Sequence, residues 1–141
     1  MRAMTEDEWR SFLLDTPRTA KLATVRKDGR PHVAPIWFAL DADELVFTTW
    51  HESVKAKAIL RDPRVSLCVD DERPPFAFVM LDGTATIDED PAHLRAWAAR
   101  IGGRYMGQDQ AEMYGERNGI PGELLVRVTI TNVLAVDGVA E

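Results

Sequence analysis

The sequence is poor in cysteine and has no long apolar run, and both absences restrict the kind of protein it encodes. Its single cysteine, Cys68, cannot form a disulfide within the chain, which fits a reducing compartment. Because Cys68 lies in the alternating segment VSLCV, we expect a buried, unreactive thiol. No segment has the length of a membrane-spanning helix, and the N-terminus carries acidic residues where a signal peptide needs an apolar stretch. We therefore expect a soluble, cytoplasmic protein.

Positive charge is also in short supply. The net charge is −6, whereas a domain that binds duplex nucleic acid usually carries a basic surplus. The deficit is uneven, because residues 1–64 hold 11 Lys and Arg against 10 Asp and Glu, and residues 65–141 hold 6 against 13. Nucleic acid is therefore an unfavourable ligand, and a local anion site fits the first half better. No Ser-His-Asp set, metal-ligand cluster or pair of catalytic carboxylates is evident.

Four segments carry helix signals. A capping box, TEDE, opens the first helix at Thr5, and residues 15–17 (DTP) stop it. Ser53 is a candidate N-cap for a second helix over SVKAKAIL. The pair Asp90-Pro91 begins a third helix, which we expect to end at Gly102, and QDQAEMYGERNG is a candidate for a short fourth.

Alternating apolar residues predict about six strands joined largely by hairpins. Asp28-Gly29 is a strong turn signal between the first two, and Pro35 suits only an edge strand or a bulge, because it has no N–H. We expect a mainly β protein with helices, a single domain over residues 1–141 in which about six antiparallel strands form a small barrel. The predicted strands are residues 19–25, 32–40, 44–49, 64–70, 76–87 and 123–138, the last as one long or two short strands.

A group of basic residues follows the third predicted strand. The helix expected after Ser53 offers free N–H groups and a partial positive charge at its start, which suit an anion. Thr49 and Ser53 can add hydroxyls, and Lys55 and Lys57 add charges. The two lysines differ by about 200° around a regular helix, so both can reach one phosphate only beyond the helix end. The alternative is an ordinary solvated helix packed through its apolar side chains.

Three segments, in this order, resemble the pyridoxamine 5'-phosphate oxidase-like split-barrel superfamily. They are DGRPHVAPIWF, the pattern T-x-x-x-S-x-K followed by AILRDPRVSL, and the closing ELLVRVTITNVLAV. The chain lacks the arginine-rich strand of the oxidase branch and is more similar to the short deazaflavin-dependent reductases, which use coenzyme F420. The resemblance implies an FMN-binding split barrel, a homodimer with the cofactor between its subunits, and hydride transfer from reduced F420 to a conjugated small-molecule acceptor.

Two alternatives stay open, an FMN-dependent oxidoreductase of the same fold and a non-catalytic protein that binds a flavin or deazaflavin. The resemblance assigns no catalytic residue, and it does not identify the substrate. It implies one set of cofactor-binding residues, with Pro35, Ile36 and Trp37 beside the ring and Thr49, Ser53, Lys55 and Lys57 at the phosphate.

Two further segments bear on this expectation. Residues 18–30 hold five basic side chains against one acidic one, and they either meet the anionic tail of F420 or form a solvated surface. The insert at residues 104–122 is expected to shape the substrate mouth, because loops at a barrel rim often carry specificity. The candidates are Arg18, Lys21, Arg26, Lys27 and Arg30 for the tail, and Arg104, Tyr105, Met106 and Tyr114 for the mouth.

Overall fold

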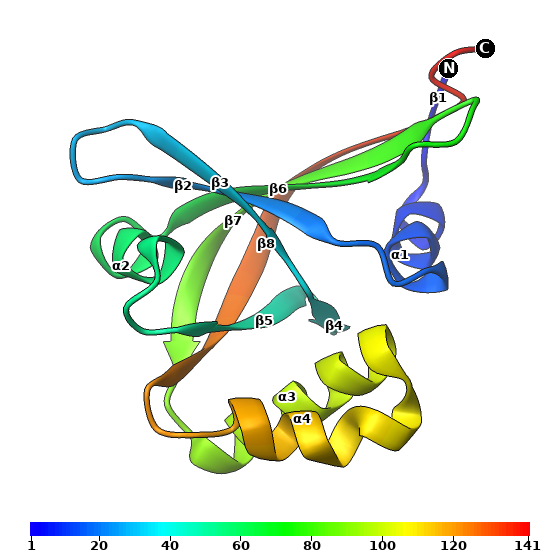
Figure 1. The fold of residues 1–141 in the computed structure, drawn as a ribbon. Helices are drawn as coiled ribbons and strands as arrows, with labels where there is room; N and C mark the ends of the chain where they lie inside the picture. Colours follow the sequence, from blue (N-terminus) through cyan, green and yellow to red (C-terminus); the bar gives the residue numbers. More distant parts are fainter.

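One curled antiparallel sheet with four α-helices around it makes up the computed structural model, which describes residues 1–141 (Figure 1). The strands are β1 (Arg2–Ala3), β2 (Ala20–Val25), β3 (Pro31–Ile36), β4 (Ala39–Asp41), β5 (Glu44–Trp50), β6 (Arg64–Asp71), β7 (Ala77–Asp88) and β8 (Glu123–Asp137). The helices are α1 (Glu6–Asp15), α2 (Val54–Arg61), α3 (Pro91–Met106) and α4 (Ala111–Asn118), with a short 3-10 turn at Gln108–Gln110. None of the helices is both long and apolar enough to cross a membrane.

The strand order shows why the barrel is split. The order is β3-β2-β6-β7-β8-β5-β4, with β1 added to β8, and every pair is antiparallel. β3 and β4 are thus the two edges of the path, although only Trp37 and Phe38 separate them in the chain. The sheet must therefore curl until its edges face each other, and no strand pairing closes that gap. The expected split barrel is confirmed.

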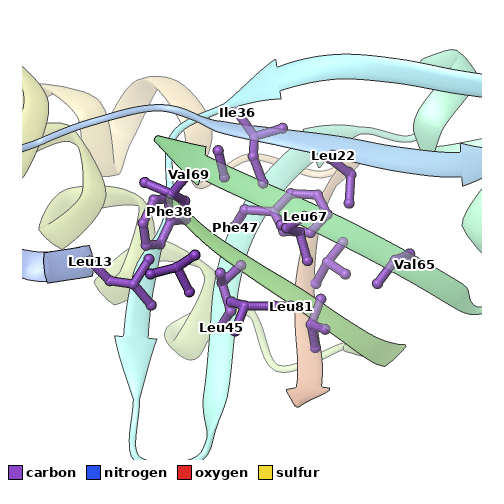
Figure 2. Close-up of a cluster of buried hydrophobic side chains, with 14 of the residues drawn as sticks. Leu13, Leu22, Ile36, Phe38, Leu45, Phe47, Val65, Leu67, Val69 and Leu81 are labelled. Atoms are coloured by element: carbon purple, nitrogen blue, oxygen red, sulfur yellow. The ribbon is translucent and has the colours of Figure 1, made fainter. Parts of the chain in front are cut away.

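The interior of the curled sheet holds the main hydrophobic core. Eighteen buried residues form one cluster, with contributions from most strands, from α2 and from α1, whose Leu13 is fully buried. Figure 2 shows Phe38 and Phe47 among Leu22, Leu45, Leu67 and Leu81 in this interior. A smaller cluster, Val46, Leu94, Trp97 and Leu125, packs α3 against β5 and β8. α3 therefore covers the sheet from outside the barrel.

The local signals for helix starts are confirmed. The Thr5 side chain accepts from the N–H of Glu8, and the Glu8 carboxylate accepts from the N–H of Thr5. Ser53 caps α2 through the N–H of Ala56, and Asp90 caps α3 with Pro91 at its first position. α2 contacts β2, β3 and β5, so it lies between the β3 edge and β5, the strand next to the other edge.

The expected end of the third helix at Gly102 is wrong, because α3 continues to Met106. Gly102 serves close packing instead of termination. A Cβ on Gly102 would lie 2.2 Å from the Cβ of Tyr114, far inside an ordinary contact distance. Glycine at this position therefore lets α4 lie directly against α3.

Two strand predictions also need correction. The predicted strand 32–40 is two strands, β3 and β4, on opposite edges of the sheet, with a break at Trp37 and Phe38. The sheet has eight strands, because of this break and because the unpredicted β1 pairs with the end of β8. Residues 123–137 form one long strand, whose pairing with β7 is irregular between Asp82 and Gly83.

Candidate functional site

A cavity of about 350 Å³ lies at the split of the barrel. Its walls come from the end of β3, from β5, from α2 and from the α3–α4 pair, so distant parts of the chain meet there. The lining residues are Pro35, Ile36 and Trp37, Thr48 of β5, Lys55 of α2, Ala98, Ile101 and Gly102 of α3, and Arg117 and Asn118 of α4. Four of the seven residues predicted to bind the cofactor, Pro35, Ile36, Trp37 and Lys55, are therefore brought together.

The free edge of β3 borders this cavity. The hairpin bond from the N–H of Arg26 to the carbonyl of Arg30 (2.8 Å) sets the alternation along β3. The backbone N–H and carbonyl groups of the even-numbered residues through Ile36 then point toward β2. Those of Val33, Pro35 and Trp37 point away from it. Pro35 therefore lies on an edge strand, as expected, and costs the ladder no hydrogen bond. The edge offers the Pro35 carbonyl and the Trp37 N–H to a ligand.

Trp37 forms the aromatic wall of the cavity, and two tyrosines hold its ring. Its ring stacks on Tyr105 with centroids 5.0 Å apart and an angle of 3° between planes. Tyr114, buried in α4, meets the Trp37 ring edge-on at 5.7 Å. Such contacts restrict the indole to one orientation, so the wall is formed before any ligand arrives.

Arg104 and Tyr105 do not line the cavity. Instead they hold Trp37 and Phe38, the two residues by which the chain crosses from β3 to β4. The Tyr105 hydroxyl donates to the carbonyl of Arg18 (2.7 Å) and accepts from the N–H of Phe38 (3.3 Å). Arg104 donates to the carbonyls of Phe38 (2.6 Å) and Leu13 (2.5 Å). Burial raises the pKa of Tyr105, which keeps its hydroxyl neutral. Neither side chain has the freedom expected of a residue at a substrate mouth.

Met106 and Tyr114, the other two candidates for that mouth, differ in burial. Met106 ends α3 with an exposed side chain, whereas Tyr114 is buried behind Trp37. The mouth predicted from residues 104–122 is therefore not formed by the four side chains together. Of this segment, Arg117 and Asn118 of α4 reach the cavity.

Two cations line the cavity from different helices. Lys55 lies in the first turn of α2, and Arg117 lies in the last turn of α4, with its guanidinium 5.5 Å from the centre of the Tyr114 ring. The sequence indicated Lys55 but not Arg117, because nothing local to α4 reveals that it lines the same cavity as α2. A phosphate or carboxylate in the cavity would be attracted by both charges.

Glu123, the first residue of β8, is a carboxylate close enough to both cations for their charges to favour its ionised form. It lies opposite Trp50 and diagonal to Thr48 across the β5–β8 ladder. Burial raises the pKa of Glu123, while the Thr48 hydroxyl, Lys55 and Arg117 favour its charged form. Glu123 lines a neighbouring cavity of about 370 Å³. The two cavities are close, because Asn118 lines the first and the next residue, Gly119, lines the second.

The other residues predicted at the phosphate lie outside the cavity lining. Thr49 is only 4% exposed, and its Oγ1 lies 2.8 Å from Oγ of Ser53. Ser53 Oγ in turn accepts from the N–H of Ala56 (3.1 Å), so both hydroxyls serve the start of α2. Lys57 is exposed on another side of the helix from Lys55, in line with their separation of about 200°.

The five basic residues at positions 18–30 do not form one surface. Arg18 pairs with Asp15 and Asp71, and Lys21 pairs with Asp70 at 2.9 Å. Only the tip of the β2–β3 hairpin keeps exposed cations, and there Arg30 lies 3.6 Å from Asp28. The cations left for an anionic tail are therefore Arg26, Lys27 and Arg30.

Comparison with known proteins gives a family and a set of related folds. The family described as pyridoxamine 5'-phosphate oxidase matches residues 5–137. No curated protein sequence matches the chain at a significant level.

Among solved structures, a conserved hypothetical protein of Mycobacterium tuberculosis is 29% identical with a TM-score of 0.84, over 96% of this chain and 86% of that one. A protein described as an F420 reductase is 29% identical with a TM-score of 0.69, over 87% of this chain and 94% of that one. The heme storage protein HutZ of Vibrio cholerae, 20% identical with a TM-score of 0.75 over the full length of both chains, shares the fold.

Proposed function

The chain belongs to the pyridoxamine 5'-phosphate oxidase family, and we propose that it is an oxidoreductase that uses reduced coenzyme F420 to reduce a conjugated small-molecule acceptor. One observation carries this proposal, namely that the cavity at the split combines an aromatic and apolar wall with two cations. A flat heteroaromatic ring joined to a phosphate group needs both features. The volume of about 350 Å³ also falls within the range of roughly 300–1,000 Å³ that small-molecule sites occupy.

The residues present fit such a cofactor. Ile36 and Trp37 would flank the ring, and the free backbone groups at Pro35 and Trp37 would meet its polar edge. Lys55 and Arg117 would hold the phosphate from two sides. When bound, reduced F420 supplies a hydride, and the protein positions the cofactor and limits access of water to it.

The source of the proton that completes the reduction of the acceptor follows from the same geometry. Tyr105 and Arg104 already donate to backbone carbonyls, and the raised pKa of Tyr105 makes it a weak acid. We infer that solvent at the open side of the cavity delivers this proton. An electron-poor double bond, as in an enone, a lactone or a tetrapyrrole methine, is the class of acceptor that suits a hydride donor.

The choice of F420 over FMN rests on two supports. A structure described as an F420 reductase is 29% identical over 87% of this chain. The exposed cations at the hairpin tip, Arg26, Lys27 and Arg30, suit the longer anionic tail of F420, which FMN lacks. FMN remains the alternative cofactor, since its ring and phosphate make the same demands on the cavity.

We also propose a homodimer that forms through the outer face of the sheet. Side chains on β3, β7 and β8 leave apolar surface there, with Val33 67% exposed, Met80 40% and Leu134 51%. Cys68 of β6 pairs with Met80 and Met80 with Leu134, so Cys68, Met80 and Leu134 lie side by side across the strands. Cys68 is therefore only partly buried on this outer face, and the expectation of a buried thiol is wrong. All four border one groove of about 390 Å³. A second copy of the chain would cover this surface and bring the two cofactor sites near the interface.

The binding site is tested by titrating the protein with F420 and with FMN. Lys55→Ala and Arg117→Ala should each weaken binding by about 1–3 kcal/mol, because each removes a charge-assisted hydrogen bond. Lys57→Ala is the matched control, since Lys57 lies on the same helix but outside the cavity, and it should change binding by less than about 0.5 kcal/mol. Equal losses for Lys55→Ala and Lys57→Ala would contradict the site.

Catalysis is tested separately from binding. The protein loaded with reduced F420 is mixed with a panel of conjugated acceptors, and reoxidation is followed by absorbance. Tight binding without reoxidation by any acceptor would support a non-catalytic binding protein instead. Tighter binding of FMN than of F420 would make FMN the cofactor, and the proposed site would still stand.

A further inference from the structure

Glu123 gives the cavity a property that the proposed function does not require. This inference rests on that function, because it concerns the same phosphate end of the site. We propose that Glu123 makes the site selective for a singly charged phosphodiester over a doubly charged phosphate monoester. F420 carries its phosphate as a diester, whereas FMN ends in a monoester, so Glu123 would set the choice between them.

The position of Glu123 supports this role. Glu123 is partly buried and lies diagonal to Thr48 across the β5–β8 ladder, and the charges of Lys55 and Arg117 favour its ionised form. Thr48, Lys55 and Arg117 all line the candidate cofactor cavity, whereas Glu123 lines the adjacent one. The carboxylate therefore lies beside the candidate cofactor cavity, next to Thr48, and leaves open the space where a phosphate would sit.

Other charged groups near Glu123 are engaged elsewhere. His51, which follows β5, bonds through Nδ1 to the carbonyl of Gly122 (3.0 Å), and its Nε2 lies 3.4 Å from Glu52. Asp88, at the end of β7, accepts from Arg127 (2.9 Å). Lys57 of α2 is exposed outside the cavity lining. Glu89 and Asp90 line the neighbouring cavity with Glu123 and Asp88, but none of these four carboxylates lines the candidate cofactor cavity. The charges considered for an anion in that cavity are thus Lys55 and Arg117 of its lining, together with Glu123, whose ionisation both of them favour.

The balance of these charges favours a monoanion. Two positive charges and one negative charge leave a net charge of +1 at the phosphate end. A phosphodiester carries a single negative charge, which this balance matches. A phosphate monoester carries about −1.5 to −2 at neutral pH, and its additional charge is repelled by the carboxylate. In a partly buried site that repulsion is screened less than it would be at the surface.

Proton uptake by Glu123 on ligand binding is a second measurable effect of its repulsion of a bound phosphate. Burial raises its pKa already, and a bound anion would raise it further, because like charge disfavours the ionised carboxylate. A dianion has the larger effect, so the monoester would bind with more uptake of a proton. The affinity of the wild type for the monoester should therefore rise more as the pH falls than the affinity of a variant that lacks the Glu123 carboxylate.

The experiment compares the wild type with Glu123→Gln, which keeps the size of the side chain and its ability to accept from Thr48. FMN and F420 are titrated calorimetrically into each protein at several pH values, in two buffers of different ionisation enthalpy. Glu123→Gln should tighten FMN about 3- to 10-fold more than F420, the effect of one partly screened like charge. Proton uptake on binding FMN should fall in the variant. Glu112→Gln, an exposed carboxylate on α4, is the control and should change neither.

The outcomes separate this inference from the proposed function. If Glu123→Gln changes both cofactors equally and proton uptake is unaltered, Glu123 does not select the ligand, although the site stands. If neither cofactor binds, or if Lys55→Ala and Arg117→Ala have no effect on either, the proposed site itself is wrong and the selectivity falls with it.

Discussion

Gly102 on α3 offers a sharp test of how the helical pair builds the cavity. A Cβ at this position would lie 2.2 Å from Cβ and 2.6 Å from Cγ of Tyr114. Ordinary carbon contacts lie at about 3.5–4.0 Å, so Gly102→Ala must push α3 and α4 apart by more than about 1 Å. The atoms it meets belong to the base of a buried side chain, which cannot rotate out of the way as a flexible tip could.

The magnitude comes from two opposing effects. Overpacking costs about 1–3 kcal/mol, and the backbone-near contact places Gly102→Ala toward the upper end. Alanine in a helix is favoured over glycine by about 1 kcal/mol, which offsets part of this cost. We expect a net loss of about 2 kcal/mol in the free energy of unfolding. For a chain of this size that lowers Tm by about 4–8 °C.

Gly103→Ala is the matched control, because it carries the same gain in helix propensity. Its Cβ would lie 3.0 Å from the Cβ of Ala111 and 3.0 Å from the end of the Gln108 side chain, which can move. Urea unfolding followed by tryptophan fluorescence measures both variants. A Gly102→Ala protein as stable as Gly103→Ala would refute the close packing of α3 on α4.

Two other predictions concern assembly and pH. We expect the wild type to sediment as a dimer at micromolar concentration, and Leu134→Glu should make it monomeric, because it places a charge in the groove on the outer sheet face. Ala96→Glu, on the exposed side of α3, is the control and should leave the dimer intact. A wild type that is already monomeric would exclude the dimer. For Asp88, burial opposes ionisation, but the N–H of Asp90, Arg127 and His93 together hold its pKa at about 2. Since this value lies below that of an unfolded Asp, about 3.9, the stabilisation is present above pH 4 and is lost as the pH falls from about 4 to about 2. Asp88→Asn should remove part of that loss in urea unfolding across this range, and an unchanged pH profile would contradict the role of Asp88.

Features set by neighbouring residues were predictable from the sequence. The caps at Thr5, Ser53 and Asp90 depend on hydrogen bonds within three residues, so the local pattern was sufficient. The predicted strand 32–40 failed for a different reason. Apolar residues continue through Trp37 and Phe38, where the chain crosses from one edge of the sheet to the other, and nothing in the alternation signals that the pairing partner changes.

The candidate site divides in the same way. Pro35, Ile36, Trp37 and Lys55 were indicated by the family resemblance, because they lie within two of the short segments that carry it, DGRPHVAPIWF and T-x-x-x-S-x-K. Arg117 was not indicated, because only the tertiary fold brings α4 and α2 to the same candidate cavity. The sequence indicated that Ser53 caps α2, but it could not show that Thr49 bonds to the same hydroxyl and that both side chains lie outside the cavity lining.

The segment at residues 104–122 was expected to shape a substrate mouth, and two of its residues, Arg117 and Asn118, line the candidate cavity. Arg104 and Tyr105 fix the chain where it crosses the split, and Tyr114 packs against both Gly102 and Trp37. One turn further along α4, Arg117 reaches the cavity. A displacement of α4 would therefore move Trp37 and Arg117 together, the ring wall and one of the two cations. Substitutions at the α3–α4 contact should change the affinity for cofactor first, and only through it the choice of acceptor.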